Sequence, residues 1–182
     1  CPHLHLPLQA GEDSVLSAMR RPYTTVGYES LLDRLRSRVP DLAVTTDIIV
    51  GFPGETPELF QKTLEFAARM GFAKIHAFPY SRRKGTPAAT FGQQVSDAEK
   101  KRRVTALLEL SDQSGVHFRS QFIRRTMPVL VEKSEAGTAE GLTPNYQRVV
   151  FPCEPTTVKE QELMEVELEA ITEEGYRGRL KK

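Results

Sequence analysis

Two turns concentrate the residues of this chain that are able to do chemistry. The first, Gly-Phe-Pro-Gly at residues 51–54, follows residues 44–50, whose β-branched character predicts a strand buried on both faces of a parallel sheet. Glycines there allow the backbone to approach a ligand closely. Thr56 and Pro57 then have the form of a helix N-cap followed by proline at the first helical position. Strand, turn and helix together predict a ligand site at the carboxyl end of a sheet.

This turn is neither of the common phosphate-binding loops, because no Gly-Lys-Ser/Thr follows it and it lacks GxGxxG. An ordinary βα turn without a ligand is the alternative interpretation. For acid–base chemistry the neighbourhood offers three candidates, Asp47, Glu55 and His76. An α/β enzyme acting on a phosphate-bearing substrate needs acids and bases that converge, so we rank that function last.

The second turn is the basic loop Ser-Arg-Arg-Lys-Gly-Thr-Pro at residues 81–87, which follows a predicted strand over residues 72–80. The carboxyl ends of parallel strands share one edge of a sheet, so this loop is expected near the first turn. Three adjacent cations, Arg82, Arg83 and Lys84, are suited to phosphate groups at such a rim. A solvated turn is the alternative.

The first nine residues alternate as in a strand, and His3 and His5 would project to one face of it. A metal site needs three or four ligands, and no third is evident in the sequence. We therefore expect no metal site and interpret both histidines as polar residues at the mouth of a sheet. Gln9 ends this segment just before Gly11, which would let its amide project into a site.

Helix and strand patterns alternate through the first two thirds of the chain. Apolar spacing predicts a short helix over residues 13–19, a helix around residues 28–35 and another around 60–67 that ends at Gly71. A long basic helix begins at a capping box, Ser96 to Glu99, and its buried face is predicted to hold Val104, Leu107, Leu108, Ser111, Gly115, Phe118 and Phe122. These βα units predict a parallel sheet or partial barrel. They are too few to close a barrel, so we expect a missing N-terminal half.

The pattern changes near Met127, and we predict a domain boundary between residues 126 and 127. Short alternating segments follow at residues 129–131, 147–151 and 164–168, parted by glycine and proline, which predicts a small antiparallel barrel. Residues 127–182 carry eleven acidic against seven basic side chains, a poor composition for a generic nucleic-acid clamp.

Composition describes a soluble globular protein. The 182 residues are 39% hydrophobic and 27% charged, and no apolar run is long enough to cross a bilayer. Two cysteines give no disulfide framework, so a reducing cytoplasmic location is the simpler expectation.

Four blocks of this sequence resemble the methylthiotransferases of the radical S-adenosylmethionine superfamily. They occur in order, as HLPLQAG at residues 5–11, MRRPY at 19–23, TTDIIVGFPGET at 45–56 and YSRRKGTPA at 80–88. The tail resembles the small β-barrel called the TRAM domain. Within the family, residues 3–5, 76–80 and 141–146 are most similar to the branch acting on N6-threonylcarbamoyladenosine in tRNA. The isopentenyladenosine tRNA branch and the ribosomal-protein branch are close alternatives.

The resemblance implies an α/β fold in which residues 1–126 are the C-terminal part of a partial (β/α) radical-SAM barrel and residues 127–182 a TRAM-like barrel. It also implies S-adenosylmethionine and two [4Fe–4S] clusters as cofactors, with the tRNA anticodon region as partner and no membrane. One cluster is held by a CxxxCxxC triad in the family. This chain has two cysteines and no such triad, so we expect the fragment to have no catalytic residue and no activity alone.

Site residues follow from the resemblance only as expectations. Gln9 and Arg21 would bind the ribose or amino-acid part of S-adenosylmethionine, and its adenine would lie near Asp47, Ile49, Gly51, Phe78 and Tyr80. Plain core packing is the alternative for both aromatic residues, and a surface position is the alternative for Arg21. Two departures stand out. Ala10 replaces the usual serine, and the adenine motif G-x-I-x-G-x-x-E agrees at two of its four positions, Ile49 and Gly51.

RNA contact is expected from Arg82, Arg83 and Lys84, with Tyr146 and Arg148 of the tail adding a stacking surface and one more phosphate contact. These residues also support a function of another class, an RNA-binding module without catalysis. A CxxxCxxC motif encoded upstream favours the enzyme, and an unrelated upstream sequence favours the binding module.

Overall fold

The computed structural model describes residues 1–154 and 158–181. Their contacts divide the chain into two compact units. The first unit consists of Leu4–Pro40 and Val44–Gly115, and the second of Val116–Lys182 together with Cys1–His3 and Asp41–Ala43. The predicted domain boundary between residues 126 and 127 stays a prediction.

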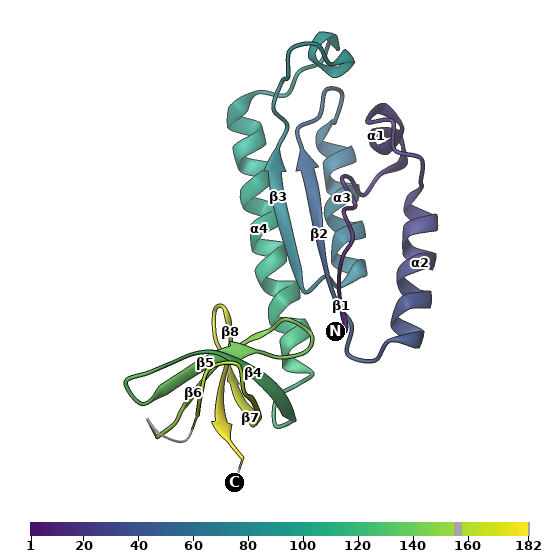
Figure 1. The fold of residues 1–182 in the computed structure, drawn as a ribbon. Coiled ribbons are helices and arrows are strands. Elements are labelled where there is room, and N and C mark those ends of the chain that lie inside the picture. Colours follow the sequence, from purple (N-terminus) through teal and green to yellow (C-terminus); the bar gives the residue numbers. More distant parts are fainter. Residues whose placement is uncertain (155–157, 182) are drawn as a thin grey trace. The chain divides into compact units, whose positions relative to one another are not determined.

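The first unit is built on a three-stranded sheet with the order β1-β2-β3 (Figure 1). Strands β2 and β3 pair in parallel, so the loops that follow them leave the same edge of the sheet. This confirms the α/β class and the parallel sheet. In chain order the elements are β1 (His3–His5), α1 (Asp13–Ala18), α2 (Thr25–Arg38), β2 (Ala43–Val50), α3 (Pro57–Met70), β3 (Lys74–Pro79), the 3-10 helix η1 (Pro87–Thr90) and α4 (Asp97–Ser120).

Capping residues set the helix ends where the sequence predicts them. The Thr56 hydroxyl accepts a hydrogen bond from the amide of Leu59 at 3.3 Å, and Gly71 ends α3 in the left-handed conformation at φ 56°. Ser96 accepts from the amide of Glu99 at 3.3 Å. In a capping box the Glu99 carboxylate would accept a hydrogen bond from the Ser96 amide. Here it forms ion pairs with arginines farther along α4 instead.

Strand β2 is buried on one face only, so the prediction of burial on both faces is wrong. Val44, Thr46, Ile48 and Val50 are buried, whereas the residues between them, such as Asp47, are half-buried. Successive residues of the strand alternate between a buried and a half-buried face. The sequence does not show this alternation, because threonine and isoleucine occur on both faces. The less buried face is the one that carries the candidate site.

The second unit is a closed barrel with the strand order β4-β5-β6-β8-β7, which confirms the predicted small barrel. Its strands are β4 (Thr126–Glu135), β5 (Thr138–Leu142), β6 (Arg148–Pro152), β7 (Leu163–Ile171) and β8 (Gly175–Leu180). Four pairings are antiparallel, and the pairing of β6 with β8 is parallel. The barrel interior is filled by buried apolar side chains from every strand, among them Val129, Ala139, Phe151, Leu168 and Tyr176.

Gly141 lies inside β5, although the sequence pattern indicated a turn there. A Cβ on this residue would collide with the backbone of Leu130 on the paired strand β4. Glycine therefore permits a close approach of two barrel strands here, rather than a reversal of the chain.

Replacing Gly141 with alanine is expected to destabilise the chain by about 1–3 kcal/mol, because one strand must shift to make room. Gly92→Ala is the matched control, since a Cβ on Gly92 would have no atom within 4 Å from the described residues beyond its two chain neighbours. Urea denaturation of both variants measures the difference. Equal midpoints for the two variants would show that the barrel absorbs the added methyl group.

Among the helices of residues 1–154 and 158–181, none is long and apolar enough to span a bilayer.

Candidate cofactor-binding site

A cavity of about 650 Å³ lies in the first unit, where β2 and β3 give way to the loops after them. Six of the seven residues predicted to bind the cofactor line it, and Gly51 alone does not. The six come from four separate stretches of the chain and are Gln9, Arg21, Asp47, Ile49, Phe78 and Tyr80. The sheet and the loop after α1 therefore bring together most of the predicted site.

Gln9 has an unusual backbone, with φ at 70° in the left-handed region that few non-glycine residues adopt. Two hydrogen bonds to β2 hold it there, from its amide to the Asp47 carbonyl at 2.8 Å and from the Ile49 amide to its carbonyl at 2.9 Å. Strain that is enforced by surrounding structure is typical of functional sites.

The Gln9 side chain is held as well, since residue 9 is only 8% exposed and its Oε1 accepts a hydrogen bond from Arg21 Nη2 at 3.0 Å. The segment after α1 thus folds back onto the sheet and brings Arg21 into the cavity wall. A guanidinium and a carboxamide side by side can together bind a carboxylate or hydroxyl group.

The wall also includes apolar and aromatic side chains. Phe78 is 49% exposed, so the alternative of plain core packing is wrong for this residue. Tyr80 packs edge-on against Phe52, with ring centroids 5.2 Å apart. Its buried hydroxyl has no hydrogen-bond partner among the described residues. The Phe78 and Tyr80 rings therefore give the cavity flat apolar surface, as a ligand with an aromatic base requires.

Gly51 supports the site from outside the cavity. Its φ is 73°, and a Cβ there would collide with the Lys100 side chain. Its amide donates a hydrogen bond to the Glu55 carboxylate. Phe52, the next residue, lines the cavity instead. The glycine is thus required by the shape of the turn, and the structure gives it no ligand-facing position.

Behind this turn lies a buried ion pair between Glu55 and Arg103, whose side chains are 0% and 2% exposed. Arg103 Nη1 donates to Glu55 Oε2 at 2.7 Å and to the Glu55 carbonyl at 2.9 Å. Its Nε donates to Glu99 at 2.8 Å. Burial raises the pKa of Glu55, while the bonds from Gly51 and Arg103 favour its charged form. Arg103 thus fixes the helix that carries it against the glycine turn.

Sequence reasoning missed Arg103, which we counted among the cations of a basic helix. The position of Arg103 could have indicated its burial, because it lies one helical turn before the buried Leu107 and so on the same face of the helix. Leu108, which we placed on the buried face, is 47% exposed, so that assignment is wrong. The buried stripe of α4 therefore passes through a charged residue.

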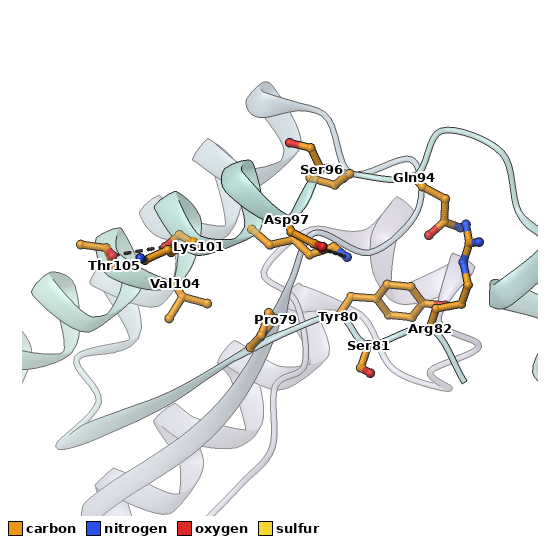
Figure 2. Close-up of a pocket in the computed structure, with 12 residues that line it drawn as sticks. Pro79, Tyr80, Ser81, Arg82, Gln94, Ser96, Asp97, Lys101, Val104 and Thr105 are labelled. Atoms are coloured by element: carbon orange, nitrogen blue, oxygen red, sulfur yellow. Dashed lines mark hydrogen bonds and ion pairs between the residues drawn. The ribbon is translucent and has the colours of Figure 1, made fainter. Parts of the chain in front are cut away.

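The basic loop is exposed, and Arg82, Arg83 and Lys84 form no ion pair with the residues that the structure describes. Arg83 lines the cavity described above. Arg82 lines a second, open cavity of about 890 Å³ between this loop and the start of α4 (Figure 2). Lys100 and Lys101 line it too, so the second cavity is basic, although Asp97 pairs with Lys100 at 3.2 Å.

Tyr146 and Arg148 lie together in the second unit, before and at the start of β6. Tyr146 is 54% exposed and its ring stacks on His3, with centroids 4.7 Å apart. Arg148 forms an ion pair with Glu140 on the neighbouring strand. That pairing compensates the Arg148 charge, so this residue is less suited to a phosphate than the cations of the loop.

The three acid–base candidates do not converge in the cavity. Asp47 lines the cavity, whereas His76, its partner on the neighbouring strand β3, does not. Glu55 is sequestered in its ion pair and does not line the cavity. An α/β enzyme acting on a phosphate-bearing substrate needs several acids and bases in one cavity. Among the described residues, only one of the three candidates lines this cavity.

Comparison with known proteins gives the class first. Residues 1–67 match the model of the Radical SAM superfamily. Threonylcarbamoyladenosine tRNA methylthiotransferase MtaB of Bacillus subtilis is 44% identical over 154 residues, which cover 82% of this chain and 34% of that protein. The tRNA-2-methylthio-N(6)-dimethylallyladenosine synthase of Desulfitobacterium hafniense is 42% identical over 157 residues, 85% of this chain and 35% of that protein.

A second synthase of that name, from Pseudomonas fluorescens, is 38% identical over 181 residues, 98% of this chain and 41% of that protein. The chain thus spans about a third to two fifths of the length of these curated relatives. It belongs to the radical S-adenosylmethionine methylthiotransferase family.

The cavity fits one of the family's cofactors. S-adenosylmethionine combines a carboxylate, ribose hydroxyls and a flat purine, which match the Arg21 and Gln9 side chains and the apolar wall. An iron–sulfur cluster does not fit this chain by itself. Such a cluster needs three or four thiolates, and the sequence contains only Cys1 and Cys153.

Proposed function

We propose that this chain is part of an enzyme that adds a methylthio group to N6-threonylcarbamoyladenosine next to the anticodon of tRNA. The observation that carries the proposal is the convergence of Gln9, Arg21 and the sheet residues in one cavity of a chain from this family. The identity of 44% to the Bacillus protein supports this substrate. The dimethylallyladenosine synthases, at 42% and 38%, make the isopentenyladenosine base the second candidate.

In this proposal the cavity binds S-adenosylmethionine. Arg21 pairs with its carboxylate, Gln9 orients the amino-acid or ribose part, and Ile49 with the aromatic residues covers the adenine. With an iron–sulfur cluster, this cofactor supplies a carbon radical that removes hydrogen from an unreactive C–H position. The protein residues bind and orient it and exclude water.

The partners follow from the same proposal. The clusters would be bound by an N-terminal half of the same polypeptide, which would cover the half-buried face of the sheet. The substrate would be the anticodon region of tRNA, and the enzyme would act in the cytosol. The 182-residue chain would then be inactive by itself.

Nucleoside mass spectrometry tests the substrate. The natural gene, with everything encoded before Cys1, is expressed in bacteria lacking their own methylthiotransferases. We expect the 2-methylthio derivative of threonylcarbamoyladenosine in tRNA. Methylthiolation of isopentenyladenosine alone would establish the second candidate. No modification by a cluster-loaded protein that still binds tRNA would support the binding module without catalysis.

Arg21→Ala is expected to weaken S-adenosylmethionine binding by about 10- to 100-fold, because a hydrogen bond to a charged group contributes about 1.5–3 kcal/mol. Isothermal titration of the full-length protein measures the affinity. Arg34→Ala, an exposed substitution on α2, is the control and should bind as the wild type does. Unchanged binding by the Arg21 variant would remove this residue from the site.

Anaerobic reconstitution of the 182-residue chain with iron and sulfide should give no stable four-iron species, since the chain supplies two thiols. Iron and sulfide analysis after desalting, with the visible absorption spectrum, checks this. A stable brown protein with four irons per chain would contradict the expectation.

A further inference from the structure

The half-buried face of the sheet carries a group of three metal-ligating side chains that the proposed function does not use as a group. They are His5, Asp47 and His76, one from each strand. One potential ligand atom from each lies within 4.8 Å of the others. All three strands belong to the same sheet, so the arrangement rests on backbone pairing rather than on a loop.

The distances within the group suit a small cation. His5 Nε2 lies 3.3 Å from Asp47 Oδ2, and the rings of His5 and His76 are 5.8 Å apart between centroids. Ligand atoms bound tetrahedrally at about 2.0–2.1 Å are separated by roughly 3.3–3.4 Å. One pair already has that spacing, and the potential ligand atom of His76 lies within 4.8 Å of both partners.

His5 also has the supporting contact that metal-bound imidazoles usually have. Its Nδ1 lies 2.9 Å from the hydroxyl of Thr45, which shares the face of β2 with Asp47. When Nδ1–H donates to this hydroxyl, the lone pair of Nε2 points to the carboxylate oxygen of Asp47. A cation between these two acceptors makes that arrangement favourable, and the outer hydrogen bond holds the ring for it.

We propose that His5, Asp47 and His76 bind one divalent cation of the zinc class. Two imidazoles and one carboxylate are a ligand set that zinc prefers, and three protein ligands leave a fourth position for water or another oxygen ligand. The side chains of His5 and Asp47 are 41% and 30% exposed, so a fourth ligand can reach the ion from the less buried side of the sheet.

The site is distinct from the cavity but adjacent to it. Asp47 lines the cavity, whereas neither histidine does. Variants of the histidines therefore test the metal without removing a residue of the proposed cofactor site. The proposal replaces our expectation of no metal, which considered only His3 and His5. Asp47 and His76 join His5 through strand pairing between distant segments, which spacing along the chain does not reveal.

The test uses the 182-residue chain with Cys1→Ser and Cys153→Ser, so that no thiolate contributes. Zinc is titrated against a chromogenic chelator, and cobalt(II) is added separately as a spectroscopic probe. We expect one zinc per chain and the visible absorption of tetrahedral cobalt(II). His5→Gln and His76→Gln should each weaken zinc binding by at least about 10-fold, because changes outside the ligand shell already cost 10- to 100-fold. Thr45→Val should weaken it by about 10-fold.

His117→Gln is the matched control, since His117 is exposed on α4 outside the group. Its zinc affinity should equal that of the parent chain. Circular dichroism verifies that each variant is folded. Less than one zinc per chain, octahedral cobalt spectra, or equal affinities for the His76 and His117 variants would overturn the proposal and leave a hydrogen-bonded His–Asp–His group.

Discussion

Replacing Arg103 with alanine is expected to lower the free energy of unfolding by about 3–5 kcal/mol, the usual effect of removing one partner of a buried ion pair. Glu55 would remain in a fully buried position without its cation. The turn at Gly51 would also lose the helix contact that holds Glu55 against its amide. We therefore expect the variant to be the least stable of the single substitutions described here.

Arg102→Ala is the matched control, because Arg102 is its neighbour, pairs with the same Glu99 and has a side chain that is 62% exposed. Its removal should change stability by less than about 1 kcal/mol. Guanidinium denaturation of both variants gives the comparison. Similar losses for the two arginines would mean that the ion pair to Glu55 contributes no more than the surface pair.

The effect of Arg103→Ala should depend on pH. Burial already raises the pKa of Glu55, and loss of the arginine removes an interaction that favours the charged form, so the pKa of Glu55 rises further in the variant. A carboxyl group whose pKa is higher in the folded than in the unfolded state does not reduce the free energy of unfolding at pH values below its unfolded-state pKa. As the pH rises through its folded-state pKa, the free energy of unfolding falls. The variant should therefore be closest to the wild type in mild acid and fall farther behind toward pH 8.

The second large effect concerns RNA. Replacing Arg82, Arg83 and Lys84 together by alanine is expected to reduce the slope of log affinity against log salt by about 2.7 for a duplex stem, and by about 2.1 for single strands. The three side chains are exposed and unpaired among the described residues, so they are free to displace counterions from phosphates. The acidic barrel, whose Arg148 is paired with Glu140, offers little to replace them.

Full-length protein and unmodified tRNA over a range of salt concentrations provide the measurement. The control variant replaces Arg34, Arg38 and Lys74, which are exposed and change the net charge equally. It should keep the wild-type slope. Parallel slopes for wild type and the loop variant would make the loop a solvated turn. Equal reductions in both variants would indicate a general charge effect.

The sequence by itself determined the parts of this fold that local physical chemistry decides. Thr56 and Pro57 begin α3 and Gly71 ends it, because capping hydrogen bonds and the left-handed conformation involve neighbouring residues only. The short alternating segments after Met127 indicated the strands of a barrel, because the alternation of side chains along a strand is also a local property. Residues at the ends of β2 and β3 were predicted to meet, since parallel strands direct their carboxyl ends to one edge.

The tertiary structure alone decided which side chains are partners. Arg103 meets Glu55 across 48 positions of the chain, and Asp47 meets His76 through strand register. Gly141 serves strand contact rather than a turn because another strand passes beside it. Such contacts depend on how separate elements pack, and local sequence patterns carry no record of that packing. The buried ion pair and the candidate metal site are therefore properties of the folded chain.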